Sequence, residues 1–390
     1  MSRSIRRVLL ALSGALLVVA LLPSPAALAD SFYQPPDPLP AGAPGDLVRS
    51  RVSDNPPTRG KAKAWQVMYL STNALGQRHA VTGTVLVPTH VDPRTAPVVG
   101  LAVGTHGPAF RCTPSTMVEV GALYEQPAVN DLLARGYAVA ITDYEGYTPE
   151  PRTTYIVGRS MGAAVIDVVR AALRLPATGL SANAKVAFRG YSQGGGAAMW
   201  AGETQPGYAP ELNLVGVVGG GVPADLIQVA LPLEGKPGYG VLAYALMGLD
   251  QAYPELKLND YLNDKGRTEF ARMRREACTF ELLTWYPKGK LSDHTTSSPV
   301  LTPQWLARVR ENKLGTKKIP VPVFQYHAEN DELVHLPQAK ELFADYCRLG
   351  VNARWQGYPS DHITLVYTGN EAAHRFLADR FAGVPATSGC

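Results

Sequence analysis

Short apolar runs alternate along most of the chain with segments that carry apolar side chains at helical spacing. The apolar runs at residues 97–103, 137–142 and 186–188 predict buried strands. Between them, residues 129–134 and 163–175 have the periodicity of helices, and the second of these stops at Pro176. The order strand, helix, strand, helix, strand is typical of a parallel sheet wrapped by helices, which is an α/β fold.

The pattern on either side of this region completes the expected architecture. Residues 30–57 are rich in Pro and Gly and predict an extended arm with little regular structure. Alternating or continuous apolar positions predict a hairpin at residues 64–69 and 80–87, and further strands at 214–218, 321–326 and 353–358. Helices are expected at 337–349 and 371–381.

The rhythm of strands and helices breaks between residues 224 and 315. This stretch holds an apolar helical segment at 241–249 and a polar one at 267–278, and it predicts a helical cap inserted over the carboxyl edge of the sheet. The expected organisation is therefore a signal peptide at 1–29, a first core part with its arm at 30–223, the cap at 224–315 and a second core part at 316–390. The segment 241–249 is either the core of the cap or the wall of an acyl-binding tunnel, and both can hold.

The N-terminus has the three parts of a secretory signal peptide. Arg3, Arg6 and Arg7 form a basic region, an apolar run of about 15 residues follows, and Ala27-Leu28-Ala29 is a cleavage site. The apolar run is short for a membrane span, which needs about 20 residues. We therefore expect export and cleavage near Ala29.

Charge and cysteine content narrow the function classes. Loss of residues 1–29 removes three arginines and no acidic residue, so the net charge falls from +4 to +1 and no basic stripe for nucleic acid remains. No second apolar run approaches the length of a membrane span. Four cysteines in an exported chain suggest two disulfides, for which three pairings are possible. No two cysteines have the C-x-x-C spacing, so a structural zinc site is not expected.

The strongest chemical signal is the stretch KVAFRGYSQGGGAAMW at 185–200. It places Gly190-Tyr191-Ser192-Gln193-Gly194, a G-x-S-x-G motif, between an apolar run and a small-residue helix. Such a turn strains the serine backbone and presents its hydroxyl at the start of a helix, where developing negative charge is favoured. Ser192 is the predicted nucleophile; the alternative is a glycine-rich turn with a solvated serine.

A serine nucleophile needs a base, and the base needs an acidic partner. Asp331 follows the first strand after the cap and His362 follows the next strand, so both should meet Ser192 at one edge of a parallel sheet. Glu329 and Glu332 compete with Asp331 for the acidic role. Among the eight histidines, we expect His79 and His90 to lie in surface loops and His327 to be a core residue.

A second G-x-S-x-G lies at Gly158-Arg159-Ser160-Met161-Gly162. The segment before it is polar and not strand-like, so we interpret Ser160 as a residue at the N-terminus of a helix. The oxyanion of an acyl transfer needs two N–H donors. We assign one to Gln193, the residue after the nucleophile, and one to the His106 or Gly107 region.

The chain resembles the secretory lipase family, a lipase-A-like branch of the α/β-hydrolases. The motifs that carry the resemblance are GTHGPAFRC at 104–112, ITDYEGY at 141–147, VIDVVRAA at 165–172, GYSQGGGAA at 190–198, AENDELV at 328–334 and SDHITL at 360–365. The match covers nearly the whole mature chain.

The resemblance implies an α/β-hydrolase with a mainly helical lid and hydrolysis of acylglycerols and other carboxylic esters. It implies a triad of Ser192, Asp331 and His362, with an oxyanion hole of the His106 loop and Gln193. It pairs Cys112 with Cys278, which leaves Cys347 with Cys390. It implies no metal, no organic cofactor and no protein partner, but a lipid or small ester as substrate and transient contact with a lipid interface.

Other functions of the same fold stay open at this point. They are a non-lipase esterase, a peptidase, a polyester hydrolase and an acyltransferase, which differ in lid and pocket rather than in chemistry. A non-catalytic binding protein would lack a triad member, whereas this sequence contains all three. A cell-envelope structural protein would have repeats or a wall-anchoring tail, and neither is present.

Overall fold

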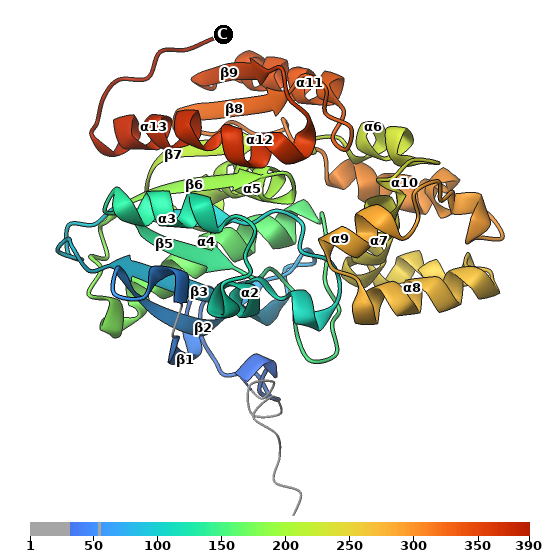
Figure 1. Cartoon of the computed structure of the whole chain (residues 1–390), viewed down its shortest axis with the longest axis horizontal. Coiled ribbons are helices and arrows are strands. Elements are labelled where there is room, and N and C mark those ends of the chain that lie inside the picture. Colours follow the sequence, from blue (N-terminus) through green and yellow to red (C-terminus); the bar gives the residue numbers. More distant parts are fainter. Residues whose placement is uncertain (1–31, 54–55) are drawn as a thin grey trace, which may run out of the picture.

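The computed structural model describes residues 32–53 and 56–390. Its centre is a nine-stranded sheet in the order β1-β2-β3-β5-β4-β6-β7-β8-β9 (Figure 1). The predicted signal peptide at residues 1–29 lies outside the described residues. Among the residues that the structure does describe, no helix is both long and apolar enough to cross a bilayer.

The sheet is antiparallel at one end and parallel over the rest. β1 pairs with β2, β2 with β3, and β3 with β5 in antiparallel register, and all later pairs are parallel. The strands are β1 (Leu47–Ser53), β2 (Ala62–Thr72), β3 (Arg78–Pro88), β4 (Val98–Ala102), β5 (Ala138–Thr142), β6 (Lys185–Tyr191), β7 (Asn213–Gly220), β8 (Val323–Ala328) and β9 (Ala353–Tyr358). Both β4 and β5 are buried along their whole length, as their apolar runs predict.

Helices cover both faces of the sheet. In Figure 1, α3 (Gln126–Ala134) and α13 (Asn370–Phe381) lie in front of the strands, and α4 (Gly158–Arg174) and α5 (Gln193–Tyr208) lie behind them. The core also contains α11 (Leu336–Arg348) and the two short helices α2 (Pro114–Val120) and α12 (His362–Thr368). Gly162 permits close approach of α4 to α5, because a Cβ there would lie 2.9 Å from the backbone of Trp200.

The chain between β7 and β8 forms a separate group of helices, and we call residues 224–315 the cap segment. It contains α6 (Leu226–Ala230), α7 (Tyr239–Ala252), α8 (Asp264–Glu276), α9 (Thr279–Thr284) and α10 (Pro303–Glu311). Figure 1 shows these helices together on one side of the sheet, in yellow and orange. The apolar α7 lies inside this group, since Leu242, Leu246 and Leu249 are all buried.

Three local features differ from the expectation. The arm at residues 30–57 contains the edge strand β1, whose sequence LVRSRVS lacks the regular apolar–polar alternation that would indicate a strand. Two short helices, α2 and α12, were not among the predicted elements, because seven residues are too few for a clear periodicity. His79 lies in β3 and is partly buried, so its prediction as a surface-loop residue is wrong.

Candidate functional site

Ser192 lies at the sharp turn between β6 and α5. Its backbone has φ 57° and ψ −124°, a conformation that costs energy for a residue with a side chain. The turn is possible because both flanking glycines touch backbone: a Cβ at Gly190 would lie 2.1 Å from Gly194 O, and one at Gly194 would lie 1.9 Å from Ala102 O. The Ser192 N–H donates to Gly220 O of β7 at 2.9 Å, which fixes the turn to the sheet.

A continuous row of hydrogen bonds joins Ser192, His362 and Asp331. The Ser192 Oγ lies 2.9 Å from His362 Nε2, and His362 Nδ1 lies 2.7 Å from Asp331 Oδ2. Because a carboxylate can only accept, Nδ1 carries the proton and Nε2 is the acceptor for the serine hydroxyl. The three residues follow β6, β8 and β9, whose parallel carboxyl ends meet at one edge.

The carboxylate of Asp331 is held on both oxygens. Oδ1 accepts the backbone N–H groups of Leu333 at 3.0 Å and Val334 at 2.6 Å, and Oδ2 faces His362. Burial would raise the pKa of Asp331, but the neighbouring His362 and these hydrogen bonds outweigh burial and hold the pKa below its usual value. The group is therefore ionised at neutral pH, as a partner for a charged imidazole must be.

The rival acids occupy other positions. Glu332 accepts the backbone N–H of His362 through Oε2 at 2.9 Å, while Tyr191 donates its hydroxyl to His362 O at 2.8 Å. Both hydrogen bonds hold the backbone of His362, and the Tyr191 ring also lies against the imidazole, with ring centroids 5.1 Å apart. Glu329 is exposed beyond the end of β8. Sequence reasoning missed Tyr191, although its place next to Ser192 in the motif puts it on the same strand end.

The loop after β4 lies beside Ser192. Thr105, His106, Ser192 and Gln193 line one cavity, and Gln193 is the first residue of α5. The His106 ring is buried, and burial lowers its pKa to about 4, so the ring is neutral at pH 7. Its Nδ1 must donate to Gly104 O at 2.9 Å, which leaves Nε2 without a proton. In this arrangement the His106 ring cannot donate to an oxyanion, so that role does not fall to this side chain.

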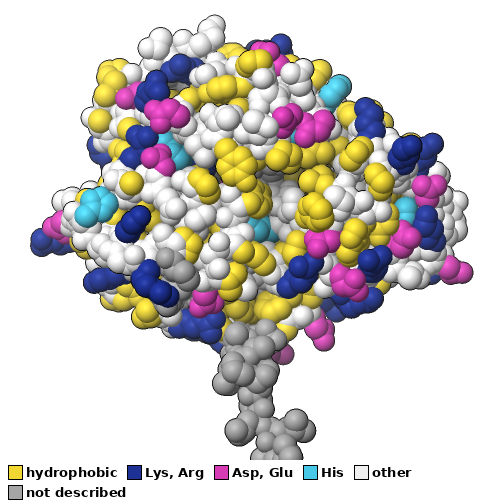
Figure 2. Space-filling view, in the orientation of Figure 1, with side chains coloured by type: hydrophobic (Ala, Val, Ile, Leu, Met, Phe, Trp, Pro, Cys, Tyr) yellow, Lys and Arg dark blue, Asp and Glu magenta, His cyan; other side chains and the backbone are white. Residues whose placement is uncertain are grey.

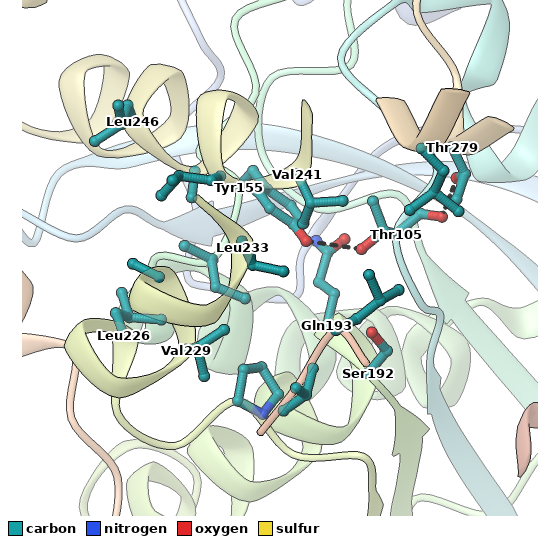
Figure 3. A pocket seen from close by; sticks show the side chains of 18 of the residues that line it. Thr105, Tyr155, Ser192, Gln193, Leu226, Val229, Leu233, Val241, Leu246 and Thr279 are labelled. Carbon is teal, nitrogen blue, oxygen red and sulfur yellow. Dashed lines mark hydrogen bonds between the residues drawn. The ribbon is translucent and has the colours of Figure 1, made fainter. Parts of the chain in front are cut away.

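The cavity above Ser192 has a volume of about 880 Å³ and runs into the cap segment. Figure 3 shows the side chains of Leu226, Val229 and Leu233 on one side of it and those of Val241 and Leu246, from α7, on another. Ser192 and Gln193 lie at one end. An elongated apolar space that ends at a strained serine can hold a hydrocarbon chain with its polar end at that serine.

Ser160 of the second G-x-S-x-G motif has different surroundings. It is fully buried near the start of α4, and its hydroxyl donates to Glu145 Oε2 at 2.5 Å. His79 faces the other oxygen of Glu145 at 3.5 Å, so a histidine is close but does not contact the serine oxygen. The Ser160 hydroxyl thus contacts a carboxylate but no histidine, and Ser160 does not line the cavity, so we interpret it as part of the packing between α4 and the loop before it.

Two disulfides close the structure, Cys112–Cys278 and Cys347–Cys390. These are the pairs that the resemblance implies. The first joins the loop after β4 to the start of α9 in the cap segment, and the second joins α11 to the C-terminal tail. Within residues 32–53 and 56–390 there is no group of three His, Cys, Asp or Glu side chains that could hold a metal ion.

The mostly parallel sheet with helices on both faces makes this protein an α/β-hydrolase. Residues 113–389 match the model of the secretory lipase family. Lipase 6 of Candida albicans is 29% identical over 389 residues, which are 93% of this chain and 83% of that protein. The secreted triacylglycerol lipase of Malassezia furfur is 31% identical over 384 residues, or 93% of this chain and 77% of that protein.

A solved structure has the same architecture. The X-ray structure of Candida antarctica lipase A in its closed state matches with a TM-score of 0.85 and 25% identity over 93% of this chain and 88% of that one. The chain belongs to the secretory lipase family. It is accordingly an enzyme of the lipase and carboxylesterase class.

Proposed function

We propose that this protein is a secreted serine hydrolase that cleaves lipid esters with Ser192, His362 and Asp331 through an acyl-enzyme. The observation that carries the proposal is the row of hydrogen bonds at 2.9 and 2.7 Å from Ser192 Oγ to Asp331, at the end of an apolar cavity. Export rests on the predicted signal peptide and on membership in the secretory lipase family.

In the first half-reaction, Ser192 attacks the ester carbonyl while His362 Nε2 takes its proton. Asp331 keeps the other ring nitrogen protonated and stabilises the imidazolium. The amide of Gln193 at the start of α5 and an amide of the loop after β4 stabilise the oxyanion, each by about 3–4 kcal/mol. His362 then gives the proton to the leaving alcohol, and a water molecule hydrolyses the acyl-enzyme by the same steps.

The substrate class follows from the cavity and its mouth. The aliphatic walls contributed by α6 and α7 suit the hydrocarbon chain of a fatty acyl ester. The mouth carries five exposed apolar side chains that come from four separate elements. These side chains are Leu231, Phe280, Leu301, Ile363 and Tyr367. Figure 2 shows hydrophobic side chains gathered around the hollow. An exposed apolar ring of this kind fits transient contact with a lipid–water interface.

The test is hydrolysis of p-nitrophenyl esters with acyl chains of about two to sixteen carbons by wild type, Ser192→Ala and Ser160→Ala. Ser160 is the matched control, because it has the same motif and also lies at the start of a helix. We expect Ser192→Ala to lose activity by about 10⁴-fold or more and Ser160→Ala to keep it. An active Ser192→Ala would overturn the assignment of the nucleophile. An inactive wild type on every ester would overturn the proposed reaction.

A further inference from the structure

A buried glutamate lies beneath the loop that faces Ser192. Glu125 immediately precedes α3, is 3% exposed, and accepts the backbone N–H of Gly104 through Oε2 at 2.7 Å. Gly104 begins the loop after β4, two residues beyond the end of that strand. The mechanism described above uses neither the charge nor the hydrogen bond of Glu125.

The residue before it holds the next part of the same loop. The Tyr124 hydroxyl donates to Thr105 O at 3.3 Å, and its ring stacks on His106 with centroids 5.0 Å apart. A Cβ on Gly104 would lie 2.2 Å from the Tyr124 hydroxyl, so any other residue there would displace the Tyr124 side chain. Tyr124 and Glu125 thus contact three consecutive residues of the loop.

The surroundings of Glu125 are costly for a carboxylate. Burial raises the pKa of Glu125 to about 7, and the hydrogen bond from Gly104 and the charge of Arg189 on β6 lower it only in part. A glutamine or a leucine would fill the same space without that cost. A buried carboxyl group that lowers the stability of the fold is typical of a functional residue rather than of a stabilising one.

We propose that Glu125 is a positioning residue for ester hydrolysis, because its carboxylate holds the Gly104 N–H and so sets the loop whose amides face the oxyanion. This inference rests on the proposed function. Glu125 does not line the cavity, whereas Thr105 and His106 of the loop do, so its effect on the substrate would pass through that loop. Its contribution is to keep the loop amides in one orientation before the substrate arrives.

The experiment compares Glu125→Gln and Glu125→Leu with a matched control, Glu203→Gln. Glu203 is also buried, its pKa is also raised by burial, and it also accepts a glycine N–H at 2.7 Å, from Gly315. Glu203 differs from Glu125 because it lies in the C-terminal half of α5 and does not line the cavity. Esters that wild type hydrolyses serve as substrates, and kcat and KM are measured separately.

We expect kcat to fall about tenfold in Glu125→Gln, which keeps a weaker neutral acceptor, and about 100-fold in Glu125→Leu, which keeps none. KM should stay within about twofold, because the loop acts on the transition state more than on the bound ester. Affinity for a trifluoromethyl ketone, which forms a tetrahedral adduct with the serine, should fall in step with kcat. Glu203→Gln should keep kcat within about twofold.

Three results would overturn the inference: an unchanged kcat in folded Glu125→Gln, an equal loss in Glu203→Gln, or a change confined to KM. If Glu125→Leu does not fold, Glu125→Gln still decides, because it keeps the shape and the acceptor. Failure of the proposed function has a different signature, which is an inactive wild type or an active Ser192→Ala, whatever the Glu125 variants do.

Discussion

A buried carboxyl group whose pKa lies above its usual value makes the folded state less stable once it ionises. Burial raises the pKa of Glu125 to about 7, whereas in the unfolded chain a glutamate titrates near 4.3. The folded state therefore binds this proton more tightly. The associated stability is fully present below the unfolded pKa and is lost as the pH rises through about 7.

Glu125→Gln should consequently become more stable relative to wild type as the pH rises from about 4 to 7, by at most about 3 kcal/mol, and change no further above pH 8. Urea unfolding of both proteins at pH 5, 6, 7 and 8 measures the difference. A difference that stays constant across this range would show that Glu125 does not titrate with a raised pKa. Together with a lower kcat, the expected result would make Glu125 a residue that trades stability for activity.

At the scale of single elements, α7 lines the deep part of the cavity. Ala245 is partly exposed to the cavity, between the buried Leu242 and Leu249 on the same helix. A larger side chain at this position would project into the space proposed for the acyl chain. A short ester would still fit between the obstruction and Ser192.

We expect Ala245→Phe to lower kcat/KM for a sixteen-carbon ester about tenfold or more and to leave a four-carbon ester within about twofold. Loss of a few buried methylene contacts, at about 0.8 kcal/mol each, accounts for this size. The matched control is Ala271→Phe, since Ala271 lies on the exposed side of α8 in the same cap segment. Equal losses on both esters would argue against a tunnel along α7.

The regular elements of the core were the part most accessible from sequence. The strands before Ser192 and Asp331 each contain a short apolar run and are buried on both faces, as is typical of a parallel sheet, and their ends could be placed to within a few residues. The order of serine, acid and histidine then put all three at one edge. The structure brings them within hydrogen-bond distance, and their catalytic role is the proposal to be tested.

Contacts between remote loops could not be predicted in the same way. Glu125 meets Gly104 across 21 residues, and nothing in the local pattern of either segment indicates the partner. The tautomer of His106 likewise depends on the fold, because Nδ1 donates a hydrogen bond to Gly104 O. β1 has the sequence LVRSRVS, without regular alternation, and follows a Pro- and Gly-rich segment, so this edge strand was expected as irregular chain.

At the scale of the whole molecule, one disulfide connects core and cap. Cys112–Cys278 spans 166 residues and lies next to backbone hydrogen bonds from Ala109 to Ala277 O and from Thr279 to His106 O. Cys347–Cys390 spans 43 residues and ties the C-terminal tail to α11. From the loop-closure entropy of the unfolded chain, the two disulfides are expected to raise the free energy of unfolding by about 5 and 4 kcal/mol, which are similar amounts.

Their effects on activity should differ. The double variant Cys112→Ser/Cys278→Ser should lose both stability and kcat, because only hydrogen bonds and packing would then hold the loop after β4 to the cap segment. Cys347→Ser/Cys390→Ser should lose stability but keep kcat within about twofold at a temperature where it remains folded. Thermal unfolding followed by circular dichroism and ester hydrolysis well below the melting temperature test this. Equal loss of kcat in both variants would mean that the cap is not coupled to the site through Cys112–Cys278.

The mouth of the cavity is the other feature that only the whole molecule defines. Phe280 on α9 and Leu301 in a short 3₁₀ helix (Pro299–Leu301) are 73% and 78% exposed. Both come from the cap segment, whereas Ile363, which lines the same cavity, comes from α12 of the core. Removing two such side chains from a lipid surface costs about 3 kcal/mol, or roughly 100-fold in binding at most.

Phe280→Ser/Leu301→Ser should therefore lower the rate on an emulsified long-chain ester about tenfold or more, while a dissolved four-carbon ester is hydrolysed within about twofold of wild type. Val52→Ser is the control, because Val52 is 79% exposed on β1 and does not line the cavity. Co-sedimentation with lipid vesicles should fall in the double variant alone. If the double variant loses activity equally on the dissolved ester, these side chains shape the cavity itself, and the apolar mouth is not an interface-binding surface.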